Sequence, residues 1–246
     1  MNTSKWYKIF GISLIVISAA VYFIHYLVFH DIHHIFIYFL GDIAFVPIEV
    51  LMVTLILHQL LTYMEKRNML EKLNMVIGVF FSEIGTKFLC FLSDFDPDLD
   101  AVRNELVVTN DWNDEDFLYT KKRLKNYNYS VDIRNIDLVK LRTLLGENRN
   151  ILVRLLENPT LLEHESFTEL LRAVFHLLEE LVARGDLEDL PDTDLDHISG
   201  DIGRVYGLLV DEWLDYMQHL KNNYPYLFSL SMRTNPFDTS ASPVVK

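Results

Sequence analysis

The sequence predicts an all-α membrane protein with an N-terminal two-helix transmembrane hairpin, a long helical neck and a cytoplasmic helical bundle. Two apolar runs near the N-terminus, helix-period apolar stripes in the remainder and a sharp division of charge lead to this prediction. The chain has 246 residues and a formal net charge of −13. Residues 1–61 hold only two lysines and three acids, so the acidic charge belongs to the rest of the chain.

The first apolar run covers about residues 9–29. A bilayer core of about 30 Å needs about 20 helical residues, so this run is long enough to span. Lys5 and Lys8 precede it, as in a signal peptide. However, the run exceeds the usual apolar core of about 7–15 residues and no small-residue cleavage site follows it. We therefore expect a retained span.

The second run covers about residues 35–61 and would reach about 40 Å at a rise of ~1.5 Å per residue. The connection between the runs is short, which predicts a tight antiparallel hairpin. Lys and Arg flank the outer ends of both runs and are absent from the connection. By the positive-inside tendency, this pattern predicts a multi-pass protein of the cell membrane, in contact with lipid, with both termini cytoplasmic.

Two acids interrupt the second run. Asp42 and Glu49 are seven residues apart, so they share one face of a helix, and Tyr38 extends that face. A charge at mid-span costs about 2.5–3.5 kcal/mol on the insertion scale, and no Lys or Arg in either run can offset it. A homo-oligomer would gather these acids around a wet axis as carboxylate rings, which attract cations.

The sequence therefore predicts an oligomeric cation-conducting or cation-binding pore lined by Asp42, Glu49 and Tyr38. Two alternatives stay open. The acids, if protonated, would serve as hydrogen-bonding contacts between helices. Otherwise the hairpin is an anchor for an interaction or sensor module whose cytoplasmic domain recruits a protein partner.

Two segments carry metal-ligand residue types, which makes a divalent cation a candidate cofactor. The hairpin loop contains His30, Asp31, His33 and His34, which would ring the outer mouth of an oligomer or form a polar interfacial loop. The second segment matches positions 1, 3, 5, 7 and 12 of an EF-hand loop at Asp94, Asp96, Asp98, Asp100 and Glu105. Leu99 replaces the required glycine and Pro97 interrupts the loop, so a looser cation site or a solvated linker is the better interpretation.

The neck is predicted as one helix without a breaker from residue 64 to residue 92. Its apolar stripe has near-heptad spacing and suits either packing on its own domain or association with other subunits, which we slightly favour. The stripe contains Leu70, Leu73, Ile77, Phe80, Ile84, Phe88 and Phe91.

The remaining sequence predicts a bundle of four or five helices with few strand patterns. The expected helices run from Asn113–Glu115 to about Tyr127, from Asn135 or Asp137 to Leu145, from Glu163 to Val182 before Gly185, and from Asp194 to Leu220. An aromatic tail should dock on its own chain, with disorder over Asp238–Lys246. The predicted boundaries are 1–62 for the hairpin, 63–93 for the neck, 94–230 for the acidic domain and 231–246 for the tail.

Several function classes are disfavoured. An acidic domain lacks the clustered Lys and Arg that nucleic acid requires. One cysteine, Cys90, permits no intrachain disulfide. The sequence has no phosphate-binding glycine loop, HExxH pair or nucleophile elbow, which argues against an enzyme. The histidines of the predicted domain helices are interpreted as structural: His164, His176, His197 and His219.

Overall fold

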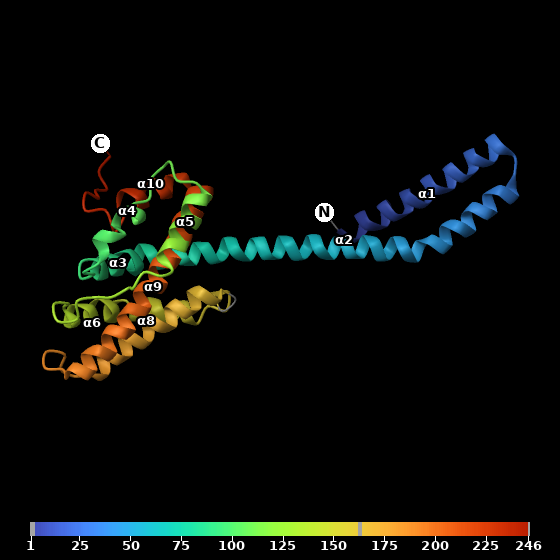
Figure 1. The fold of residues 1–246 in the computed structure, drawn as a ribbon. Coiled ribbons are helices and arrows are strands. Elements are labelled where there is room, and N and C mark those ends of the chain that lie inside the picture. Colours follow the sequence, from blue (N-terminus) through green and yellow to red (C-terminus); the bar gives the residue numbers. More distant parts are fainter. Residues whose placement is uncertain (1–2, 162–163, 246) are drawn as a thin grey trace. The chain divides into compact units, whose positions relative to one another are not determined.

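The computed structural model describes residues 3–161 and 164–245 (Figure 1). All regular elements within these residues are helices, as predicted, and no strand occurs among them. The chain divides into two compact units, residues 1–66 and residues 67–246. The tail, and the neck from residue 67 onward, were expected as separate segments but belong to the same unit as the acidic domain.

The first unit contains α1 (Thr3–Phe29) and the beginning of α2 (Ile32–Phe80). His30 has a φ of 52°, in the left-handed region, which lets the chain reverse within two residues. The Asp31 carboxylate then accepts hydrogen bonds from the backbone N–H groups of His33 and His34 and so caps α2. Both helices are long and apolar enough to cross a membrane, and their apolar stretches are unburied.

The predicted neck helix is present and reaches Ser93. It consists of the end of α2, one π-helical turn η1 (Phe81–Gly85) and α3 (Thr86–Ser93). The π turn was not predicted. At Gly85 a Cβ atom would lie 2.7 Å from the Phe81 ring and 2.8 Å from the Phe80 ring. Glycine here therefore gives two large aromatic side chains room to pack beside the turn.

Our slight preference for intermolecular packing of the neck was wrong. Leu73, Ile77, Phe80, Ile84 and Phe88 are all buried within the second unit. The Phe80 ring meets the Phe167 ring edge-on at 5.3 Å, and the Phe81 ring stacks on Tyr216 at 5.0 Å. The stripe, apart from the exposed Leu70, is covered by the chain's own domain.

Short local signals set most of the helix starts in the domain. Asn113 forms a capping box with Asp116, and Asp137 accepts from the Lys140 N–H. Glu163, the expected start of the next helix, lies outside the described residues; His164 caps that helix instead. The remaining elements are η2 (Leu99–Ala101), α4 (Arg103–Leu106), α5 (Asp114–Leu124), α6 (Leu138–Glu147), α7 (Arg149–Leu156), α8 (Glu165–Ala183), α9 (Asp192–Asn223) and α10 (Pro225–Arg233).

The aromatic tail docks on its own chain, as expected. Asn235 is buried and donates to the Leu106 carbonyl, and the Phe237 ring packs on Trp213 at 5.2 Å. Disorder was expected over Asp238–Lys246, and the structure describes this segment as far as residue 245. Residues 239–240 form a turn, residues 243–244 form a bend, and the Arg233 guanidinium donates to the Pro243 carbonyl. These contacts hold the end of the described chain against the domain.

Candidate functional site

The two acids of the second apolar run are exposed side chains of α2. The Tyr22 hydroxyl of α1 donates to Asp42 Oδ2 over 3.4 Å, which is long for such a bond. Glu49 has no hydrogen bond or ion pair with any residue that the structure describes. The hairpin therefore leaves one acid weakly partnered and the other without a partner among those residues.

Tyr38 lies on the inner side of the hairpin. It lines an open groove of about 410 Å³ between α1 and α2, together with Ser18, Val21, Tyr22, His25 and Ile35. Tyr22 joins this groove to Asp42 through its hydroxyl. The acid-bearing face of α2 thus continues into a partly polar groove, which has room for water.

The structure does not bring the four polar residues of the hairpin loop together as metal ligands. Asp31 uses Oδ1 to cap α2. The His34 ring turns toward α1 and stacks on His25 at 5.6 Å, while His30 packs near Tyr26. The sequence did not predict His25 as a neighbour of the loop histidines, because its proximity to His34 depends on the pairing of the two helices.

The acidic segment after the neck is also not arranged as a cation loop. Asp96 is buried and accepts from the Tyr127 hydroxyl at 2.7 and 2.9 Å, and burial raises the pKa of its carboxyl. Asp100 pairs with Arg103 at 3.1 Å, and Glu105 pairs with Arg123 at 3.2 Å. Helical turns η2 and α4 direct these carboxylates apart, so the EF-hand positions have different partners.

Among the described residues, no group of three or more His, Cys, Asp and Glu side chains is placed so that it could hold a metal ion. None of the acids in the predicted EF-hand register belongs to such a group: neither Asp94 and Asp98 nor the hydrogen-bonded or ion-paired Asp96, Asp100 and Glu105.

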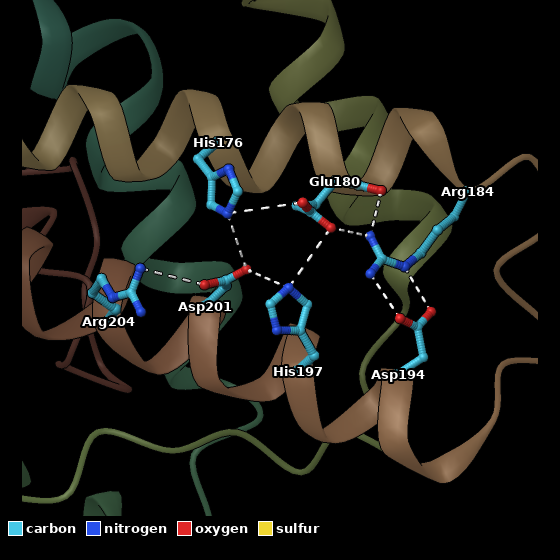
Figure 2. A network of polar contacts seen from close by, with 7 residues as sticks. All are labelled: His176, Glu180, Arg184, Asp194, His197, Asp201 and Arg204. Atoms are coloured by element: carbon cyan, nitrogen blue, oxygen red, sulfur yellow. Dashed lines mark hydrogen bonds and ion pairs between the residues drawn. The ribbon is translucent and has the colours of Figure 1, made fainter.

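A polar network between α8 and α9 was missed from the sequence (Figure 2). Arg184, just beyond α8, holds Asp194 of α9 through two hydrogen bonds of 2.6 and 2.7 Å and donates to Glu180 at 2.5 Å. This guanidinium lowers the pKa of both carboxyls. The other members of the network are His176, His197, Asp201 and Arg204.

A sequence signal for this network did exist. His176 and Glu180 have i,i+4 spacing on one helix, and His197 and Asp201 repeat that spacing on the next. Each pair alone is common on helices. Only the packing of α8 along α9 turns the two pairs toward one another.

Comparison with known proteins divides the chain at nearly the same place as the structure. Residues 2–61 match the family model described as MJ1433, N-terminal helical domain. Residues 69–233 match the model described as uncharacterized protein MJ1433, C-terminal helical domain. A Methanocaldococcus jannaschii protein described as uncharacterized protein MJ1433 is 52% identical over 241 residues, which cover 98% of this chain and 97% of that protein. No solved structure matches the chain.

Proposed function

The chain belongs to the MJ1433 family, and we propose that it is an oligomeric membrane protein whose second span conducts or binds cations through Asp42 and Glu49. The observation that carries the proposal is a pair of acids on one face of a long, unburied apolar helix. A single weak hydrogen bond, from Tyr22 to Asp42, connects this pair to the rest of the hairpin. The relative is described as uncharacterized, so the proposal depends on the geometry of this chain.

A single hairpin surrounded by lipid is a poor environment for these carboxylates. Lipid hydrocarbon solvates the apolar side chains of α1 and α2 but provides neither water nor hydrogen-bond donors for a carboxylate. The Tyr22 hydroxyl, at 3.4 Å from Asp42, offers one weak contact, and Glu49 gains none within the described residues. Assembly around a water-filled axis would hydrate both acids while the apolar faces remain in lipid.

Such an axis would favour cations over anions. Asp42 and Glu49 would form two stacked rings, almost two helical turns apart, without a Lys or Arg in the apolar runs to neutralise them. Tyr38 and the groove of the hairpin would extend the polar path from the Asp42 ring. We place this assembly in the cell membrane with both termini in the cytoplasm, following the basic residues that flank the spans.

The test uses the full chain reconstituted into lipid vesicles, with cation flux and cation-to-anion preference as readouts. We expect Asp42→Asn and Glu49→Gln each to reduce cation flux or selectivity, because each removes one carboxylate per subunit from the axis. Glu65→Gln is the matched control, since it makes the same chemical change at an exposed acid beyond the second apolar run.

Oligomeric state is measured on the same preparations by native mass spectrometry in detergent. The proposal requires an oligomer that persists in both variants. A strict monomer, or unchanged flux in both Asp42→Asn and Glu49→Gln, would reject it.

A second function is favoured by the continuity of α2. The apolar run and the beginning of the buried neck are parts of one helix, α2. This arrangement suits a membrane-anchored sensor or interaction module that recruits a cytoplasmic protein. Replacing residues 1–61 with an unrelated two-span anchor distinguishes the functions: retained activity in cells favours the module, and lost activity favours the pore.

A further inference from the structure

Protonatable side chains follow one side of α2 from the hairpin loop into the apolar run. His34, Tyr38 and Asp42 recur every four residues, and Glu49 follows Asp42 by seven. Residues with these spacings project from the same side of a helix. At a rise of ~1.5 Å per residue, the series extends about 22 Å, which is most of a hydrocarbon core of about 30 Å.

Two side chains of α1 complete the series, because α1 packs antiparallel to this part of α2 (Figure 1). At the loop end, the His25 ring stacks on the His34 ring with centroids 5.6 Å apart. The His34 ring in turn meets the Tyr38 ring at 4.6 Å. Further along, the Tyr22 hydroxyl donates to Asp42 Oδ2 over 3.4 Å. Two imidazoles, two phenols and an acid therefore follow one another along the hairpin.

The open groove between the helices connects the imidazoles to the acid. His25, Tyr38 and Tyr22 all line this groove of about 410 Å³. A water molecule takes about 30 Å³ in the liquid, so the groove has room for several. Among the described residues no direct hydrogen bond joins the imidazoles to the Tyr22 hydroxyl, and water in the groove would bridge them.

His34 gives an independent indication that a hydrogen-bonding group belongs beside it. Its Nδ1 atom is buried and has no hydrogen-bond partner among the described residues. A buried polar atom without a partner is costly. The ring contacts both His25 and Tyr38, so groove water would satisfy it. A neutral imidazole accepts a proton at one nitrogen while it donates from the other, which suits His34 to pass protons.

We propose that the cation carried at Asp42 and Glu49 is the proton, and that the groove of each hairpin delivers it. This inference rests on the proposed pore, since Asp42 passes the proton on to the shared axis. A proton from solution at the loop end binds the His34 or His25 imidazole and crosses the groove through water. The Tyr22 hydroxyl gives its proton to the Asp42 carboxylate and regains one from that water. Every group returns to its starting form once Asp42 releases the proton.

The chemistry of the groove favours a proton over Na⁺ or K⁺. A metal cation that leaves water needs several oxygens in place of its hydration shell. The groove offers only scattered hydroxyls and an imidazole, with Val21 and Ile35 between them. Each of those polar groups can both accept and donate a proton. Chains of Asp, Glu and His within membranes are typical of proton relays.

The experiment uses the full chain reconstituted into phospholipid vesicles that contain a pH-sensitive dye. In one arm, a K⁺ gradient with valinomycin sets the voltage and drives proton uptake. In the other arm, uptake of radioactive Rb⁺ is measured without valinomycin. We expect proton uptake above that of protein-free vesicles and Rb⁺ uptake equal to theirs. Proton uptake should also be slower in D₂O, because each step transfers a proton between hydrogen-bonded groups.

Two substitutions interrupt the series before the acids. Tyr22→Phe and His34→Gln should each lower proton uptake by about 10-fold or more, less than the roughly 10²–10⁴-fold contributed by a positioned proton-transfer group in an enzyme, because groove water offsets part of the loss. Tyr7→Phe and His58→Gln are the matched controls and should leave uptake unchanged. Tyr7 lies outside the groove, and His58 lies on the face of α2 opposite Glu49.

The outcomes separate this inference from the pore on which it rests. Rb⁺ uptake equal to or faster than proton uptake would overturn the inference and leave a cation pore. Proton uptake that is lost in Asp42→Asn but normal in both Tyr22→Phe and His34→Gln would support the pore and overturn the groove as its supply. Absence of both fluxes in the wild type would reject pore and inference together. Native mass spectrometry verifies that Tyr22→Phe and His34→Gln assemble as the wild type does.

Discussion

At the scale of single residues, Glu212 is an acid in the core of the second unit. Its exposed fraction is 2%, and burial raises the pKa of its carboxyl despite the partly opposing effects of Ser166 and His164. The folded chain therefore binds this proton more tightly than the unfolded chain, whose Glu pKa is about 4.3. Stability contributed by the neutral carboxyl is present below that pH and is lost as pH rises through the raised folded pKa.

Glu212→Gln should therefore raise the melting temperature at pH 7, because an amide of similar size carries no charge to desolvate. The difference from the wild type should shrink toward zero below about pH 4, where both side chains are neutral. Thermal unfolding followed by circular dichroism across pH tests this. The exposed acid Glu169 provides the control, as Glu169→Gln should show no such pH-dependent gain. A lower melting temperature for Glu212→Gln at pH 7 would show that the charged form is stabilising.

Residues differ in how much the sequence reveals about them. Asp42 and Glu49 can be identified from the sequence because a charge within an apolar run is anomalous wherever the helix packs. His176 and Asp201 are ordinary surface-type residues until α8 and α9 come together. Their pairing depends on the tertiary contact between α8 and α9, which the sequence alone does not reveal.

At the scale of elements, helix starts could be predicted better than helix ends. Asn113 and Asp137 cap their helices through local hydrogen bonds that the sequence encodes directly. By contrast, the ends predicted at Tyr127 and Leu220 each differ by three residues from those of α5 and α9, at Leu124 and Asn223. The short helix α7 and the π turn η1 were also missed, since tertiary packing decides both.

Two glycines on α9 should respond oppositely to alanine. A Cβ atom on Gly203 would lie 2.5 Å from the backbone oxygen of Tyr129, whereas nothing lies within 4 Å of one on Gly200. Gly200→Ala should stabilise by about 0.8–1 kcal/mol through helix propensity alone. Gly203→Ala should instead destabilise by about 1–3 kcal/mol, because the Tyr129 backbone must move.

Chemical denaturation of the full chain in detergent, monitored by the aromatic signals of the second unit, measures both glycine changes. Equal effects of the two substitutions would contradict the close approach of the Tyr129 segment to α9. Gly200 serves as the matched control because it lies on the same helix, one turn earlier.

At the scale of the whole molecule, the division into units depends on what covers the neck. The apolar stripe could be recognised in the sequence, but its periodicity is the same whether another subunit or the chain's own domain buries it. Burial of Phe80 and Phe88 in the second unit shows that the domain does so. A domain boundary at residue 94 would therefore divide the hydrophobic core of the second unit. The two family models are instead divided earlier, since one ends at residue 61 and the other begins at residue 69.

Truncation tests this division. A fragment of residues 67–246 should fold as a soluble protein with a cooperative urea transition, whereas residues 100–246 should not. The buried side chains of the neck that the shorter fragment lacks include Leu73, Ile77, Phe80, Ile84, Phe88 and Leu92. At about 1.5–3 kcal/mol each, these six side chains alone contribute about 9–18 kcal/mol. That loss is comparable to the roughly 5–15 kcal/mol by which a domain is stable. Circular dichroism and size-exclusion chromatography distinguish the outcomes. A cooperative transition in residues 100–246 would show that the neck is an addition to the domain and not part of its core.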